Sequence, residues 1–136
     1  MRFFLLCCLL FGSLSLLEAE IFEDYKDFAR LMKYERDYET ARVKAIKQKK
    51  LLFVLYVKDG CPFCSHLEEE VLTDRDVRAY INKNFVPAII NEYDRGYPKF
   101  LYSYIAPVSY VIEPKTNKVV KKIIGYMEVD QYLWQF

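Results

Sequence analysis

An unbroken apolar run at residues 51–57, LLFVLYV, constrains the fold of this chain more than any other segment. Its length fits a β-strand, and the lack of alternation between apolar and polar residues indicates a strand that is covered on both faces. Asp59 and Gly60 break the run, and Cys61 and Pro62 then begin a helix, because proline is favoured at the first helical position. The segments around this strand-to-helix junction therefore decide the fold class.

Those segments predict a mixture of helices and strands. Residues 20–50 place apolar side chains at helical spacing and predict an amphipathic helix in two pieces. A helix over residues 61–72 is followed by one that Thr73 or Asp74 caps, with Val77, Tyr80 and Ile81 on its buried side. Strands are predicted over residues 85–91, 107–114 and 119–125, the last two as a hairpin, and a closing helix over residues 127–136. This order predicts an α/β sandwich, with a central mixed β-sheet flanked by helices.

The first residues have the pattern of an export signal. After Arg2, residues 3–17 are almost continuously apolar. This is about the length of a signal-peptide core and is short for a membrane span. We therefore expect residues 1–19 to be a cleaved signal peptide, and residues 20–136 to form one domain that is periplasmic or secreted. A retained N-terminal membrane anchor is the alternative.

Charge and cysteine content narrow the function. The chain has 136 residues with 20 basic and 19 acidic side chains, so no nucleic-acid partner is expected. Removal of the signal takes away Cys7 and Cys8 and leaves Cys61 and Cys64, which close a loop too small to constrain the unfolded chain much. The pair is therefore predicted to be chemical rather than structural.

Too few ligands are present for a metal or haem site at this pair. Covalent haem attachment needs histidine directly after the second cysteine, where the chain has Ser65. A zinc site needs about four ligands, and the mature chain offers two cysteines and His66. We expect no metal and no other cofactor.

Their positions predict different roles for the two cysteines. Cys61 lies where a strand ends and a helix begins, and the free N–H groups and the helix dipole there favour a thiolate. Cys64 lies one turn further along the same helix face and should be more buried. We expect Cys61 to react with the substrate and Cys64 to resolve the mixed disulfide.

Two segments resemble proteins of the thioredoxin fold. Residues 51–91 contain an apolar strand, Cys-Pro-Phe-Cys, and a further helix and strand, and residues 105–126, IAPVSYVIEPKTNKVVKKIIGY, contain a proline, two strands and Gly125. This combination is similar to the exported thioredoxin-like group that includes DsbC- and SoxW-like domains, over residues 40–136. The resemblance implies a thioredoxin-like sandwich and thiol–disulfide oxidoreductase activity.

The resemblance also implies a substrate site. Pro107 matches the cis-proline of the family, which lies beside the cysteines, and the backbone of Ala106 would then pair with an extended substrate peptide. Pro62 and Phe63 are expected to contact the substrate as well. An ordinary proline at the start of a strand is the alternative for Pro107.

The chain departs from the family at the proton acceptor. Thioredoxins commonly carry a buried aspartate where this chain has Leu55. Lys58, Glu68 and Glu69 are the candidate replacements, and Glu68 lies one turn after Cys64. We nevertheless expect all three candidates to be solvent-exposed charges.

The segment 92–104, EYDRGYPKFLYSY, is dense in aromatic residues. They form either a substrate-recognition surface near Pro107 or core and rim packing, and we expect packing for most of them. The residues concerned are Tyr93, Tyr97, Phe100, Tyr102 and Tyr104.

Together these patterns predict an extracytoplasmic thiol–disulfide oxidoreductase that exchanges disulfides with protein thiols and disulfides. Phe63 places no charge between the cysteines, which favours a reductase over an oxidase. A reductase there needs an electron donor, for which we expect a membrane thiol-transfer protein. We expect a monomer, because the dimerisation domain of the isomerases is missing. Glutathione is not expected as a dedicated partner, since GYMEVD lacks the second glycine of the glutaredoxin site. The alternative is a non-catalytic binding module with a static disulfide.

Overall fold

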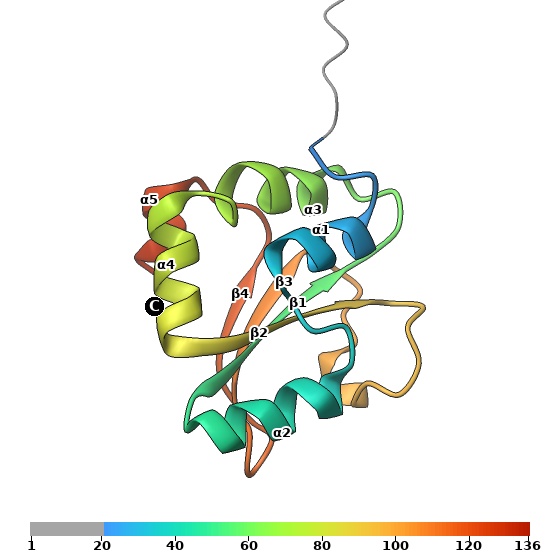
Figure 1. Cartoon of the computed structure of the whole chain (residues 1–136). Coiled ribbons are helices and arrows are strands. Elements are labelled where there is room, and N and C mark those ends of the chain that lie inside the picture. The colour runs from blue at the N-terminus through green and yellow to red at the C-terminus, as the bar shows by residue number, and fades with distance from the viewer. Residues whose placement is uncertain (1–20) are drawn as a thin grey trace, which may run out of the picture.

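A computed structural model describes residues 21–136, so the predicted signal peptide at residues 1–19 lies outside the described residues. The predicted order of helices and strands is confirmed over this part of the chain (Figure 1). The elements are α1 (Tyr25–Met32), α2 (Tyr38–Gln48), β1 (Leu51–Val57), α3 (Pro62–His66), the π-helical turn η1 (Leu67–Val71), α4 (Arg75–Asn84), β2 (Phe85–Asn91), the 3₁₀ turn η2 (Lys99–Leu101), β3 (Val108–Glu113), β4 (Lys118–Ile124) and α5 (Val129–Leu133).

The four strands form one mixed sheet in the order β2-β1-β3-β4. β1 is parallel to β2 and antiparallel to β3, and β3 and β4 form the predicted antiparallel hairpin. β1 is therefore an inner strand, and residues 52–57 are buried, as the apolar run predicted. The mixed sheet flanked by helices is confirmed.

Side chains that alternate along β1 enter two separate cores. Phe53, Leu55 and Val57 pack with residues of α1, α3, η1, α4 and α5 on one face of the sheet. Leu52 and Val54 pack with α2 and η2 on the other face. In Figure 1, α2 lies alone on one side of the sheet, while α1, α3, α4 and α5 lie on the opposite side. The result is a three-layer α/β/α sandwich.

Helix α1 is held at both ends against the sheet. Its first residue, Tyr25, donates a hydrogen bond of 2.7 Å from its hydroxyl to Asp94, in the turn after β2. Beyond its C-terminus, the N–H of Glu35 donates to the carbonyl of Pro87, and the N–H of Ile89 donates to the carbonyl of Glu35, both at 2.9 Å. These contacts fix α1 beside β2, on the same face of the sheet as the helix that carries the cysteines.

Three local expectations are refined by the structure. The cap of α4 is Asp74, whose carboxylate accepts the N–H groups of Asp76 and Val77. Tyr80 is exposed rather than buried, because its ring packs at the surface against Phe136. The closing helix α5 is shorter than the sequence pattern predicted. In residues 21–136, no helix combines the length and the apolar character needed to cross a membrane.

Candidate active site

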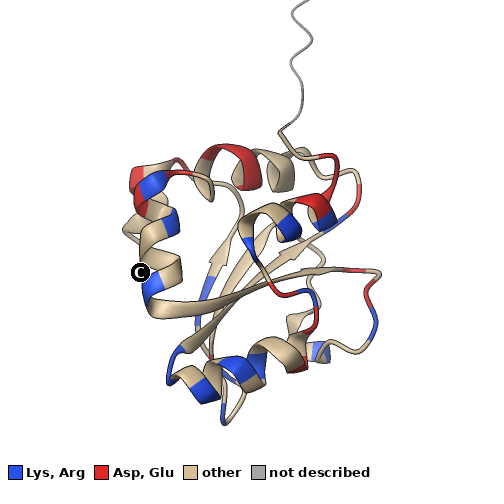
Figure 2. Cartoon of the chain, viewed as in Figure 1, with Lys and Arg blue, Asp and Glu red and all other residues tan. Residues whose placement is uncertain are grey.

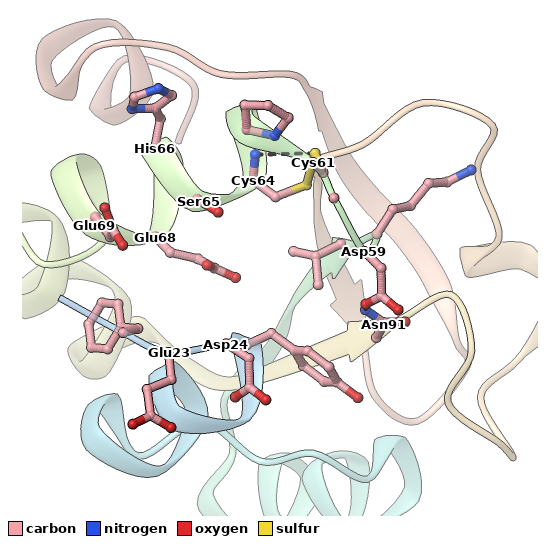
Figure 3. A pocket seen from close by; sticks show the side chains of 16 residues that line it. Glu23, Asp24, Asp59, Cys61, Cys64, Ser65, His66, Glu68, Glu69 and Asn91 are labelled. Carbon is pink, nitrogen blue, oxygen red and sulfur yellow. Dashed lines mark hydrogen bonds between the residues drawn. A yellow bond between two sulfur atoms is a disulfide. The ribbon is translucent and has the colours of Figure 1, made fainter. Parts of the chain in front are cut away.

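Cys61 stands at the junction between β1 and α3. Gly60 has a left-handed φ of 62°, which a glycine adopts without strain, and it turns the chain from the strand into the helix. Cys61 is the N-cap of α3, and Pro62 occupies the first helical position, as predicted. The N–H of Cys64 donates a hydrogen bond of 3.2 Å to Sγ of Cys61, and the two sulfurs form a disulfide (Figure 3).

The two cysteines differ in their accessibility. Cys61 is partly exposed, whereas Cys64 is 3% exposed and belongs to the core beneath α1. Phe63 lies between the two cysteines in the sequence and is 61% exposed, and its uncharged ring places no charge beside either sulfur. A partner can therefore reach Cys61 from solvent, while Cys64 is reached through Cys61.

The segment 106–107 lies against the reactive sulfur. Sγ of Cys61 is 3.7 Å from the carbonyl oxygen of Ala106. The Ala106–Pro107 peptide bond is cis, in agreement with the resemblance. Pro107 is buried, and its carbonyl accepts a 2.8 Å hydrogen bond from the N–H of Gly125, just after β4. The structure thus brings together residues that are more than forty positions apart in the sequence.

A cleft of about 500 Å³ opens between the disulfide and the N-terminus of α1. Both cysteines line it, with Phe22, Tyr25 and Val57 as its apolar and aromatic walls. Its carboxylates come from three segments of the chain: Glu23 and Asp24, Asp59, and Glu68 and Glu69. In Figure 3 the side chain of Glu68 extends into this space, and Glu23 and Asp24 lie across the cleft from it.

The expectation that Glu68 is an exposed charge is wrong. Its side chain follows Cys64 by four residues, so it faces the same way, and only 6% of the residue is exposed. The π-helical turn that contains Glu68 faces the segment that begins α1 across the cleft. Burial, and then the negative charges of Glu69 and Asp24, raise the pKa of Glu68 to about 7. Glu69 and Lys58, the other candidates, are partly exposed.

Lys58 and His66 line the cleft, and each contacts a carboxylate outside it. Nζ of Lys58 is 3.5 Å from the carboxylate of Glu92 and donates to the carbonyl of Tyr104 at 3.3 Å. Nδ1 of His66 is 3.1 Å from the carboxylate of Glu70. Figure 2 shows how charge is distributed, with acidic residues on η1 and near the start of α1 and mostly basic residues along α2. The site is therefore negatively charged.

A buried asparagine fixes the turn that precedes Cys61, and no sequence pattern pointed to it. Asn91, at the end of β2, is 2% exposed, and its Nδ2 donates a hydrogen bond of 2.8 Å to the carboxylate of Asp59. The N–H of Asn91 donates to Asp94, which also accepts the hydroxyl of Tyr25. The turn before the cysteine, the end of β2 and the start of α1 thus share one hydrogen-bond network.

The aromatic segment is divided between packing and exposure. Tyr97 and Tyr102 pack on the ring of Tyr56, and Phe100 packs on Tyr38. Phe100 and Tyr102 remain 40% and 47% exposed, so their packing is at the rim. The other two aromatic side chains of the segment, those of Tyr93 and Tyr104, are largely exposed.

Within residues 21–136, no group of three or more His, Cys, Asp or Glu side chains is arranged to hold a metal ion.

Comparison with known proteins agrees with this geometry. The sequence model described as "Thioredoxin-like domain" matches residues 38–135. No curated protein sequence matches the chain. Among solved structures, the chain is similar to a thioredoxin from Thermus thermophilus, with 19% identity and a TM-score of 0.63 over 74% of this chain and 82% of that one.

Two further solved structures are similar to the chain. One is the oxidised C-terminal domain of Neisseria meningitidis DsbD, with 16% identity and a TM-score of 0.57 over 74% of this chain and 94% of that one. The other is a disulphide isomerase from Xylella fastidiosa Temecula1, with 21% identity and a TM-score of 0.50 over 62% and 68% of the two chains. At these identities the likeness shows a shared fold.

Proposed function

Because this chain belongs to the thioredoxin-like domain family, we propose that it is a thiol–disulfide oxidoreductase that acts on protein disulfides through Cys61 and Cys64. The observation that carries the proposal is the asymmetry of the pair. Cys61 is partly exposed at a helix N-terminus and its sulfur accepts an N–H, whereas Cys64 is buried behind it. A pair that served only as a staple would gain little from this difference, since it closes a very short loop.

The proposed reaction in the reducing direction has two exchanges. The thiolate of Cys61 attacks one sulfur of the substrate disulfide and forms a new S–S bond to it, and the other substrate sulfur leaves as a thiolate and takes a proton from water. Cys64 then loses its proton and attacks Sγ of Cys61, which forms the Cys61–Cys64 disulfide and releases the second substrate thiolate. The substrate gains two electrons, and a dithiol donor restores the protein by the same exchanges in reverse.

Glu68 is the proposed acceptor of the proton that Cys64 gives up. Its carboxyl group lines the same cleft as Cys64, and its pKa of about 7 suits a group that must both take and return a proton near neutral pH. It would do this from the helix, whereas the strand position that thioredoxins use holds Leu55, which is fully buried and apolar.

The substrate would lie across Cys61 as an extended peptide. The carbonyl of Ala106, 3.7 Å from Sγ of Cys61, supports this placement, because an extended segment beside a cysteine can pair with backbone groups there. Pro107 would hold this backbone in place, and Pro62 and the exposed ring of Phe63 would contact the substrate from the helix side.

A reductase is favoured over an oxidase by the charges around the pair. Negative charge disfavours a thiolate, and a less stable thiolate makes the disulfide harder to reduce, which lowers the reduction potential. Carboxylates line the cleft, and Phe63 adds no positive charge between the cysteines. The proposed setting is the periplasm or the exterior of the cell, with a membrane thiol-transfer protein as electron donor and the protein itself as a monomer. The apolar segment at residues 3–17 supports export.

Trapping of mixed disulfides tests the proposed function. Cys64→Ser cannot release a substrate that has bonded to Cys61, so it should accumulate adducts with insulin or a model protein disulfide that vanish on addition of dithiothreitol. The matched Cys61→Ser variant should form few adducts, because Cys64 is 3% exposed. Absence of adducts from Cys64→Ser, together with failure of the parent chain to reduce insulin, would instead support a binding module with a static disulfide.

A further inference from the structure

The cleft beside the disulfide contains a buried carboxylate without a partner. Glu68 is 6% exposed and extends into the cleft (Figure 3). Among residues 21–136, no side-chain hydrogen bond or ion pair engages its carboxylate, although buried charged groups are normally paired. The rest of Glu68 is buried and its carboxylate reaches only the cleft, so this group is placed to meet a positively charged side chain that enters there.

The other carboxylates of the cleft strengthen this negative field. Asp24 caps α1 with one oxygen, which accepts the N–H groups of Lys26 and Asp27, and Glu23 and Glu69 have side chains that line the cleft. The nearby cation Lys58 is directed to Glu92 and to the carbonyl of Tyr104 instead. Although Lys58 also lines the cleft, it is paired with Glu92, so carboxylates outnumber cations in the cleft.

We propose that this cleft binds a lysine or arginine side chain that lies near the reactive cysteine of the protein substrate. The volume of about 500 Å³ is ample for one long side chain. The walls formed by Phe22, Tyr25 and Val57 suit its methylene groups, and the carboxylate of Glu68 meets its charged end. This inference rests on the proposed function and specifies its substrate: disulfides with a basic neighbour are preferred over disulfides with an acidic one.

Charge-matched peptides test the preference directly. Two peptides differ only in the residues beside one cysteine, which are lysine in one and glutamate in the other, and each cysteine carries an uncharged mixed disulfide with 2-mercaptoethanol. The reduced parent chain should reduce the lysine peptide with a kcat/KM about tenfold above that of the glutamate peptide at low salt. The ratio should fall toward one at about 1 M salt, where screening extends over only ~3 Å.

Variants assign the preference to the cleft. The triple variant E23Q/D24N/E69Q removes charge from the cleft, and Glu68→Gln removes the buried carboxylate, so both should lower the ratio between the two peptides by at least about threefold. The matched control E39Q/D76N/D130N removes the same charge from exposed positions on α2, α4 and α5, outside the cleft, and should leave the ratio unchanged. The ratio is read instead of the rate, because Glu68 also has a proposed part in proton transfer.

A binding measurement separates failure of this inference from failure of the proposed function. The oxidised protein is titrated with cysteine-free versions of the two peptides, and backbone amide shifts are followed by NMR. Shifts at Asp24, Glu68 and Glu69 with the lysine peptide alone support the subsite, even if no disulfide is reduced. Reduction of both peptides at equal rates without such shifts overturns the subsite and leaves the oxidoreductase proposal standing. The subsite is also overturned if the triple variant and the control lower the kcat/KM ratio between the two peptides equally.

Discussion

Replacing Glu68 by glutamine should stabilise the oxidised protein above neutral pH and have little effect in acid. Glu68 is 6% exposed, and burial, with the charges of Glu69 and Asp24, raises its pKa from an ordinary 4.5 to about 7. As the pH rises from 4.5, the unfolded chain loses this proton first while the folded chain keeps it. The free energy of unfolding therefore falls between pH 4.5 and about 7 and then levels off.

The size of this effect follows from the change in pKa. At ~1.4 kcal/mol for each pKa unit, ionisation of Glu68 lowers the free energy of unfolding of the parent chain by about 3 kcal/mol. Glu68→Gln lacks this loss, because glutamine does not ionise. Urea unfolding of both proteins between about pH 4 and pH 9 should show nearly equal stabilities at the acid end and a gap of about 3 kcal/mol in favour of glutamine at the alkaline end.

The difference between the two curves is the quantity to read, because the other titrating groups are common to both proteins. Glu128→Gln removes an exposed carboxylate outside the cleft, so its stability should stay within about 0.5 kcal/mol of the parent at every pH. A gap between the parent and Glu68→Gln that does not change with pH would refute the assignment of Glu68 as a buried carboxyl that ionises near neutrality.

Two further substitutions test the site and the core. Phe63→His places a cation between Cys61 and Cys64 below neutral pH, so the reduction potential of the pair should rise by about 30 mV or more. The potential is measured by equilibration with glutathione. An unchanged potential would show that the residue at this position does not set the stability of the Cys61 thiolate. Tyr132→Phe leaves the buried hydroxyl of Ser109 without its hydrogen-bond partner at 2.6 Å, so the free energy of unfolding in urea should fall by ~1–3 kcal/mol. The control Tyr93→Phe, at an exposed ring, should lower it by less than about 0.5 kcal/mol. Equal losses of stability in the two variants would contradict a role for the buried hydrogen bond.

Elements with a strong local signal could be predicted from the sequence. The apolar run of β1 could be interpreted without knowing which elements surround it, because a run of strand length without alternation is typical of an inner strand. Pro62, and the pair Thr73 and Asp74, marked helix starts through backbone chemistry that involves only nearby residues, and the structure shows that Asp74 is the cap. The different exposure of Cys61 and Cys64 follows from the same local geometry and was predicted as well.

The burial of Glu68 could not be predicted from the sequence in the same way. Its spacing from Cys64 placed it on the correct helix face, but the sequence favoured a solvent-exposed charge at this position. Phe22 and Asp24, which share the cleft with Glu68, lie far away in the sequence and come near the helix only in the folded chain. The π-helical turn that carries Glu68 also leaves no signature in the residue pattern.

The hydrogen-bond network of Asn91 was missed for a related reason. Asn91 ends a strand, where asparagine is ordinary, and its partner Asp59 sits in a turn, where aspartate is ordinary too. Their pairing depends on the parallel register that sets Val57 of β1 opposite Asn91 of β2. Side chains that act through long-range contacts of this kind are apparent only once the topology is known.

The equilibrium reduction potential of the Cys61–Cys64 pair is the most direct test of the proposed function. The purified domain would be equilibrated with glutathione or dithiothreitol buffers of known potential, and the fraction of oxidised pair read by thiol alkylation and mass spectrometry. We predict a two-electron titration with a midpoint closer to thioredoxin, at about −270 mV, than to DsbA, at about −120 mV. A midpoint near −120 mV would contradict the reductase direction, and a pair that does not exchange with either buffer would contradict its redox role altogether.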